Sequence, residues 1–259
     1  MYKKNKINLL IFGTTFWPLK GGAQRVAFDL FLEGIKRDEL KTYLFLPIYS
    51  KKIIPPRMLK NTYFHTRKYT PLYNGTVKLL KLIWIILNND IKIIQTHIIE
   101  PDALLAYIAS KILFFKKIVI FNTSHGQDIR SRDFVNKKFF EISLGAFLIR
   151  KISNSINMIL PSHYLADLGL KKGFFTKYSI IRNPCEEFNS DINRETDDIR
   201  EKGKKIKMIS LSGMRELKRI NKMIDLADEL NRKSMLDKYY ICGDGELRKS
   251  YEKYAQSLG

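Results

Sequence analysis

Residues 208–220 read MISLSGMRELKRI, and this stretch carries the signals that decide the fold. The apolar run over 206–212, rich in β-branched residues, predicts a buried strand that ends at Gly213. Apolar residues then recur at positions 220, 223, 224, 227 and 230, which is the spacing of one helix face. A buried strand followed directly by a helix is typical of an α/β domain.

Three cations, Arg215, Lys218 and Arg219, lie between this strand and this helix. A helix N-terminus offers amide N–H groups and a partial positive charge, so a cationic loop in front of it can hold a phosphate. The alternative is an ordinary solvated basic loop, and the spacing by itself does not choose between the two.

The same alternation of strand and helix patterns continues through the chain before this stretch. Because the strand patterns are nearly continuous apolar runs, we expect an α/β fold with a parallel, doubly wound sheet. Strands are expected over 7–12, 42–47, 91–97, 117–124, 155–160 and 178–182. Helices are expected over 77–87, 101–115 and 137–152, with a further helix that begins at 23 and a short one capped by Ser162. The stretches 48–75 and 125–133 are expected to be irregular.

The chain changes character over 186–205, where charged and polar residues predominate. We interpret 1–185 as a first domain, 186–205 as a linker, and 206–259 as part of a second domain. The second region supplies two strand and two helix patterns, which cannot bury both faces of a sheet. It ends with a strand pattern over 239–242, a Gly243-Asp244-Gly245 turn and a last helix pattern.

Composition and charge limit the function classes. The 259 residues include 46 Lys and Arg against 26 Asp and Glu, a net charge of +20. Such an excess indicates an anionic partner, namely a membrane surface, nucleic acid or phosphorylated substrate, although a Lys-, Ile- and Asn-biased genome would also produce it. No nucleic-acid-binding motif is found, so we expect no nucleic acid partner. Cys185 and Cys242 have no metal-ligand spacing and indicate a reducing, cytoplasmic compartment.

The N-terminal stretch over 1–12 superficially resembles a signal peptide, but its apolar part is short and no small-residue cleavage site follows. We interpret it as the first buried strand. No window approaches the ~18 consecutive apolar residues of a membrane-spanning helix.

In open parallel sheets ligands bind beyond the carboxyl ends of the strands, so the loops there are the candidate sites. Gly21 and Gly22 follow the first strand, where glycine lets backbone N–H groups approach a phosphate, although a simple turn would look the same. His125 and Asp128 follow the strand over 117–124 and can hydrogen-bond sugar hydroxyls or polarise a leaving group. A polar loop with a capping histidine is the alternative.

A set of motifs in this order resembles the family 4 glycosyltransferases of the GT-B fold. After the early Gly-Gly loop, the motifs are TSHGQD (123–128), LPSHYLADLGL (160–170), YSIIRNPCEEF (178–188), SLSGMRELKRINKMIDLA (210–227) and YYICGDGELRKSYEKYAQSLG (239–259). The resemblance implies two Rossmann-like domains facing each other across a cleft, the first binding the acceptor and the second a nucleotide sugar. It implies a retaining transfer of a hexose to a lipid-linked or polysaccharide acceptor.

The same resemblance assigns roles to individual residues. Arg215 and Lys218 would neutralise the diphosphate leaving group. Gly21 and Gly22 would face the donor phosphate, and His125 would act beside the reacting carbon. In addition, Gly243 and Gly245 would line the nucleotide end, and Asp128 would contact the acceptor or the sugar. The resemblance implies neither a metal nor another cofactor, because the cations do that work.

Two departures from the family pattern matter. Met214 occupies the usual arginine position, so the side chain that reaches the phosphate is not fixed by the alignment. The family's Glu-x7-Glu segment lies well beyond the Gly-Asp-Gly turn, and this sequence ends before that point, so we expect the second domain to be incomplete. The alternatives to an active enzyme are a truncated, non-catalytic remnant or a subunit that binds acceptor or membrane, with a second chain completing the domain. An anionic membrane surface at the inner face of the plasma membrane remains a candidate partner.

Overall fold

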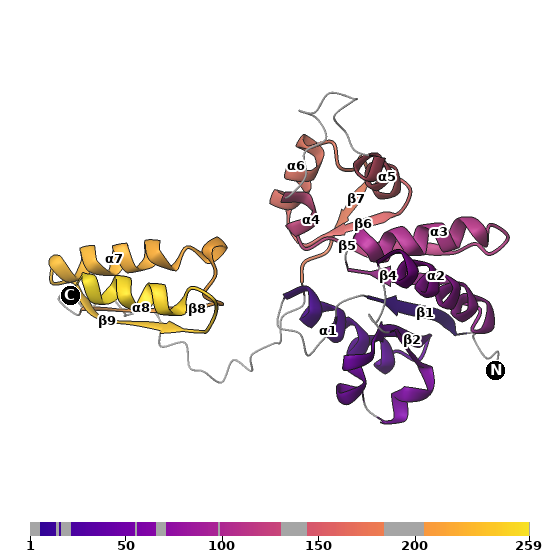
Figure 1. Cartoon of the computed structure of the whole chain (residues 1–259), viewed down its shortest axis with the longest axis horizontal. Coiled ribbons are helices and arrows are strands. Elements are labelled where there is room, and N and C mark those ends of the chain that lie inside the picture. Colours follow the sequence, from indigo (N-terminus) through magenta and orange to yellow (C-terminus); the bar gives the residue numbers. More distant parts are fainter. Residues whose placement is uncertain are drawn as a thin grey trace. The chain divides into compact units, whose positions relative to one another are not determined.

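The computed structural model describes residues 6–13, 16, 22–54, 56–65, 71–97, 99–130, 144–183 and 205–258. The chain divides into two compact units, Met1–Glu186 and Glu187–Gly259, which are described here one at a time (Figure 1). Apart from Lys205, the predicted linker over 186–205 lies outside the described residues, as does Gly21.

The first unit is built on a sheet whose described strands all run parallel, in the order β3-β2-β1-β4-β5-β6-β7. These strands are β1 (Ile7–Phe12), β2 (Leu40–Pro47), β3 (Thr62–His65), β4 (Ile93–Thr96), β5 (Val119–Thr123), β6 (Asn157–Leu160) and β7 (Tyr178–Ile180). The strand order reverses between β1 and β4, which makes the sheet doubly wound, as predicted.

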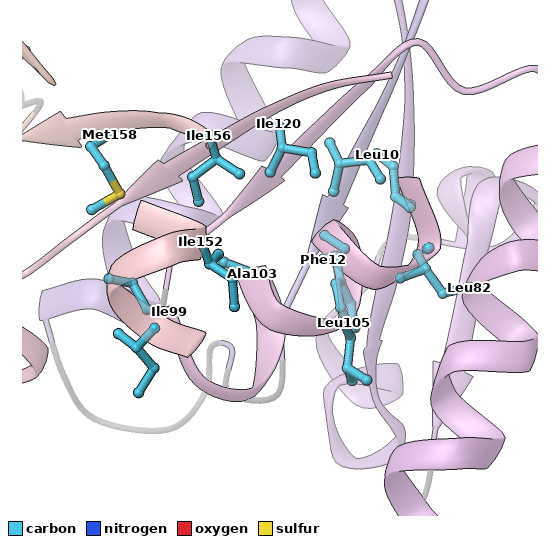
Figure 2. Close-up of a cluster of buried hydrophobic side chains, with 14 of the residues drawn as sticks. Leu10, Phe12, Leu82, Ile99, Ala103, Leu105, Ile120, Ile152, Ile156 and Met158 are labelled. Carbon is cyan, nitrogen blue, oxygen red and sulfur yellow. The ribbon is translucent and has the colours of Figure 1, made fainter. Parts of the chain in front are cut away.

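Helices cover both faces of this sheet because successive strand residues point to opposite sides. Leu10 and Phe12 of β1 pack in a cluster with α2 and α3, whereas Ile11 packs with α1 on the other face. Figure 2 shows the first cluster, into which β5, β6 and α5 also send apolar side chains. The helices are α1 (Gly22–Lys36), α2 (Pro71–Asn88), α3 (Leu104–Ile112), α4 (Gln127–Arg130), α5 (Leu144–Ser153) and α6 (His163–Lys171). As predicted, Ser162 caps α6, its Oγ accepting the Leu165 N–H at 3.3 Å.

Two stretches predicted to be irregular contain regular structure. Residues 48–75 include the 3₁₀ helices η1 (Ile48–Ile53) and η2 (Pro56–Asn61), the edge strand β3 and the first residues of α2. Residues 127–130 of the predicted polar loop form α4. Strand β3 was missed because four residues between two breaker-rich segments give no periodicity to detect, and its stability comes from pairing with β2.

Helix bounds also shift. The helix predicted from 101 to 115 is a π-helical turn, η3 (Ile99–Ala103), followed by α3, which ends at Ile112. Of the helix predicted over 137–152, residues 144–152 are helical and 137–143 lie outside the described residues.

The second unit contains two parallel strands, β8 (Ile206–Leu211) and β9 (Leu236–Cys242), and two helices, α7 (Ile220–Arg232) and α8 (Arg248–Ser257). A short 3₁₀ helix, η5 (Glu216–Lys218), precedes α7. The core of this unit joins Met214, Ile220 and Ile224 to Tyr251, with Tyr239 and Ile241 of β9 packed against them. The predicted apolar face of α7 is therefore confirmed.

The prediction that β8 is buried is wrong. Only one face of the β8–β9 pair is covered by α7 and α8 in the described part of the chain. The opposite face presents Ile209, which is 62% exposed, Leu211, which is 74% exposed, and Tyr240, the register partner of Ile209. An apolar strand sequence predicts burial only if both faces have neighbours, and the described residues of the second unit cover only one face.

No helix in the described part of the chain combines the length and the hydropathy needed to cross a bilayer.

Candidate functional site

The four histidines of the chain all follow, or end, strands of the first sheet. His65 is the last residue of β3 and His97 comes directly after β4. His125 lies two residues after β5, and His163 begins α6 after β6. Because the strands are parallel, their carboxyl ends share one edge, and the edge beside the β1–β4 reversal is where such sheets bind ligands.

At this edge His97 and His125 contact each other. The His97 Nδ1 atom lies 3.3 Å from His125 Nε2, and the two rings lie edge to edge, with their planes 16° apart and their centroids 5.5 Å apart. His97 is only 6% exposed, and its Nε2 has no hydrogen-bond partner among the described residues. The sequence predicted a role for His125, whereas His97 was taken simply as the end of a strand.

Both imidazoles are neutral at pH 7. Burial, with a smaller contribution from the charge of His125, lowers the pKa of His97 from 6.5 to about 3. Burial also lowers the pKa of His125, although the nearby Asp128 carboxylate opposes this shift. A neutral imidazole carries one N–H donor and one acceptor nitrogen, so the pair can exchange a single hydrogen bond.

The loop that carries His125 is fixed by its own polar groups. Ser124 Oγ donates to Asp128 Oδ1 at 2.6 Å, and the Ile129 N–H donates to the same oxygen at 3.2 Å. Gly126 has a φ of +95°, and a Cβ atom there would lie 2.9 Å from Leu165 Cδ2. Asp128 therefore holds the loop at the start of α4, and its predicted contact with acceptor or sugar stays a prediction.

Buried polar groups brace the strand ends below this pair. Thr96 Oγ1 donates to Asn122 Oδ1 at 2.8 Å, and Gln95 Nε2 donates to Thr123 Oγ1 at 3.0 Å, both across β4 and β5. The signal available in the sequence was the run Gln95-Thr96-His97, three polar residues at the end of an apolar strand. Burying such side chains is unfavourable unless they are hydrogen-bonded, so polar residues at the end of an apolar strand indicate hydrogen bonds to a neighbouring strand.

Glycine 22 begins α1 at the carboxyl end of β1. A Cβ atom at Gly22 would meet nothing within 4 Å, so packing does not require a glycine there. The first turn of α1 carries no acidic residue, which leaves the positive end of the helix dipole unopposed by its own side chains. This setting suits the predicted phosphate contact but does not test it.

In the second unit, the cationic loop lies directly before α7. Arg215, Lys218 and Arg219 are exposed, and none of them forms an ion pair with a described residue. Arg219 is the N-cap of α7 in a left-handed conformation, with φ 50°, and no side chain caps this helix end. The Lys222 N–H of the first turn already donates to Arg219 O at 3.0 Å, so at most the amide groups of the first two residues of α7 are left for another acceptor.

The glycines of the turn after β9 have a packing role. A Cβ atom at Gly243 would lie 1.9 Å from Ser212 O, and one at Gly245 would lie 2.5 Å from Met214 O. The Met214 N–H donates to Asp244 O at 2.9 Å, and the Leu247 N–H donates to Met214 O at 3.1 Å. The turn thus holds the loop over 212–214 in place, and the predicted contact with a nucleotide remains a prediction.

A surface cavity of about 380 Å³ lies away from the histidine edge, at the amino-terminal ends of β5 and β6. Its lining includes Lys111, Lys116, Lys117 and Phe114. Among the described residues, no three His, Cys, Asp or Glu side chains gather as a metal site would require.

Solved structures share this fold at low sequence identity. The apo form of the lipopolysaccharide outer core galactosyltransferase WaaB aligns over 98% of this chain, with a TM-score of 0.64 and 15% identity. A glycosyltransferase from Rickettsia africae ESF-5 aligns over 98%, with a TM-score of 0.62 and 15% identity. The UDP-GlcNAc 2-epimerase of Methanocaldococcus jannaschii aligns over 97%, with a TM-score of 0.55 and 12% identity.

These likenesses confirm the predicted α/β fold of GT-B type. This chain spans 65% of the length of WaaB and of the Rickettsia protein, and 68% of the epimerase. The sequence matches no protein-family profile and no curated protein.

Proposed function

We propose that the chain is a retaining glycosyltransferase of the family 4 type, which transfers a hexose from a nucleotide sugar to a lipid-linked or polysaccharide acceptor. The observation that carries the proposal is the GT-B fold along nearly the whole chain, shared with WaaB and the Rickettsia glycosyltransferase. The motif resemblance points to the same class of enzyme. Because a UDP-GlcNAc 2-epimerase shares the fold, the fold alone does not determine the reaction, and the reaction needs an assay.

Arg215 and Lys218 are proposed to bind the donor diphosphate at the α7 N-terminus. Two features support this assignment, the absence of ion pairs to described residues and the uncapped helix end. Positive charge fixed at this place would stabilise the diphosphate as the glycosidic bond breaks. The reaction would then require no metal, and a chelator should leave turnover unchanged.

His125 is proposed to contact the transferred sugar, with Gly21 and Gly22 leaving room for the donor phosphate and Asp128 ordering the loop beside the sugar or the acceptor. His125 is neutral at pH 7, so it can donate a hydrogen bond to a hydroxyl or phosphate oxygen without the cost of burying a charge. Gly243 and Gly245 are proposed to shape the nucleotide end.

A second candidate is a protein that binds the donor, the acceptor or a membrane without turnover, alone or as a subunit. The exposed apolar face of β8 and β9 favours it, because a second chain could cover that face. In the donor-binding form of this candidate the cationic loop would still bind a nucleoside diphosphate, but catalysis would need groups from elsewhere.

The test uses the purified 259-residue chain. Calorimetry with a panel of nucleoside diphosphates and their hexoses measures binding, and labelled donors measure hydrolysis and transfer to lipid or polysaccharide extracts. Binding with turnover supports the transferase, and binding without turnover supports the second candidate. A folded chain that binds none of the panel overturns the transferase and favours a remnant or subunit that binds the acceptor or a membrane.

We also propose attachment to the cytoplasmic face of an anionic membrane. The two lysines of α2 are not free to bind lipid, because Lys78 is buried and Lys81 Nζ donates to Phe64 O at 2.8 Å. The exposed surface of α2 is an apolar stripe of Val77, Leu80, Trp84 and Leu87. Helix α3 packs beside α2 (Figure 1). The segment that follows α3 carries two exposed phenylalanines, and the lysine-lined cavity lies next to the first of them, Phe114.

Phe114 is 83% exposed and Phe115 62% exposed, and Lys111, Lys116 and Lys117 lie around them. Aromatic side chains that stand out of a surface can enter the interfacial layer of a bilayer, while lysines beside them attract anionic headgroups. This pairing of apolar and cationic groups favours a lipid surface over a purely polar partner.

A further inference from the structure

The contact between His97 and His125 constrains where each imidazole carries its proton. His97 follows β4, and His125 follows β5, and the parallel pairing of Thr96 with Asn122 sets the two loops side by side. His97 Nδ1 and His125 Nε2 face each other at 3.3 Å, so one of them must donate and the other accept. The two possible directions leave different groups unsatisfied.

If His125 donated from Nε2, the single proton of His97 would sit on its own Nε2. That atom is buried and has no partner among the described residues, so an N–H donor would be left without an acceptor. If His97 donates from Nδ1 instead, its Nε2 is only an unfilled acceptor. Buried donors without acceptors are rarer in proteins than under-used acceptors, so the second arrangement is favoured.

We propose that His97 is a positioning residue, whose Nδ1–H donates to His125 Nε2 and thereby fixes the ring and the tautomer of His125. The proton of neutral His125 then lies on Nδ1. His125 therefore offers an N–H donor, and not an acceptor, on its remaining nitrogen. Such a group recognises an oxygen that carries a lone pair, as on a hydroxyl or a phosphate, and it cannot act as a general base from that atom.

Hydrogen bonds between the ends of β4, β5 and β6 hold the backbone on both sides of the His97–His125 contact. Thr96 and Gln95 tie the end of β4 to β5, and Ser124 N–H donates to Ile159 O at 3.0 Å, which ties the end of β5 to β6. Both histidines are therefore attached to an ordered backbone, His97 after β4 and His125 after β5. The hydrogen bond between them adds to the packing around His97 and fixes the relative orientation of the two rings.

The test is a long-range ¹H–¹⁵N spectrum of the full chain labelled on histidine, recorded at pH 7 without any ligand. Only four histidines contribute, and His125→Gln and His163→Gln assign two of them. We expect the Nδ1–H pattern for His125. His97→Asn places an amide N–H near the position of Nδ1 and should keep that pattern, whereas His97→Phe removes the donor and should give a mixture of tautomers.

An Nε2–H pattern for His125 in the unaltered chain overturns the proposal, as does an unchanged His125 spectrum in folded His97→Phe. If His97→Phe does not fold, as judged by circular dichroism, the unaltered chain and His97→Asn still decide the question. The measurement needs no nucleotide sugar and no acceptor, so its failure would be distinct from the failure of the proposed transferase.

Discussion

The backbone of Gly243 passes so close to that of Ser212 that a Cβ atom at position 243 would stand 1.9 Å from the Ser212 carbonyl oxygen. The φ of Gly243 is +151°, a value that residues with side chains rarely adopt. Two independent constraints, space and backbone conformation, therefore require glycine where the turn after β9 meets the loop after β8.

Gly243→Ala should destabilise the second unit by about 2–4 kcal/mol, because both overpacking and backbone strain oppose it. Gly22→Ala is the matched control, since a Cβ atom there meets nothing within 4 Å. Hydrogen exchange of peptides from 206–258, read by mass spectrometry, checks the prediction. Equal protection of the two variants in this region would contradict the packing role.

Lys218→Ala should weaken binding of a nucleoside diphosphate hexose by about 10- to 100-fold, the effect of losing one charge-assisted hydrogen bond. Lys233→Ala removes the same charge from the far end of α7 and should leave the dissociation constant unchanged. Calorimetry on both variants makes the comparison. Similar losses in the two would mean that the ligand responds to overall charge and not to this loop.

His97 should make the chain less stable as the pH falls below about 6.5. Between its folded pKa of about 3 and the ordinary value of 6.5, the unfolded chain holds a proton on this histidine that the folded chain does not. Stability from this group is therefore fully present above pH 6.5 and declines by about 1.4 kcal/mol per pH unit below it.

Urea unfolding at pH 7.5 and pH 5.5 measures this effect. The decrease should be about 1.4 kcal/mol larger in the unaltered chain than in His97→Asn, which has no titrating group at this position. His163→Gln, a substitution of an exposed histidine, should keep the full decrease. If His97→Asn and the unaltered chain share one pH dependence, the folded pKa of His97 is not depressed.

Replacing both Phe114 and Phe115 with serine should reduce binding to phosphatidylglycerol vesicles by about 10-fold or more, since burial of one such ring is favourable by about 1.5–3 kcal/mol. Tyr164→Ser removes an exposed aromatic from α6 and serves as the control. Co-sedimentation gives the partition coefficients. Binding by the unaltered chain that does not depend on the anionic lipid fraction would contradict the role of the neighbouring lysines.

The parallel sheet of the first unit could be predicted from the sequence because strands buried on both faces consist of continuous apolar runs, such as 7–12 and 42–47. The same rule misjudged β8, whose sequence is similarly apolar but whose second face is not covered by the described residues of its own unit. A strand of four residues at the edge, β3, was missed because its partner β2 determines it more than its own composition does.

For the candidate site, the sequence indicated His125 through its place after a strand, but not the partner that orients it. His97 and His125 lie 28 residues apart, and their contact depends on β4 and β5 being neighbours in the sheet. Strand order is not written in any local pattern. The same holds for Gly243, whose turn was recognised while its close approach to Ser212 was not.

The exposed face of β8 and β9 also carries a solvent-accessible thiol, that of Cys242. Cys242 is exposed and pairs in register with Leu211, the most exposed apolar residue of β8. A soluble alkylating reagent should therefore modify Cys242 rapidly in the chain by itself. A polypeptide that binds this face would shield the sulfur. A slower alkylation of Cys242 would therefore report that the exposed face of β8 and β9 is covered.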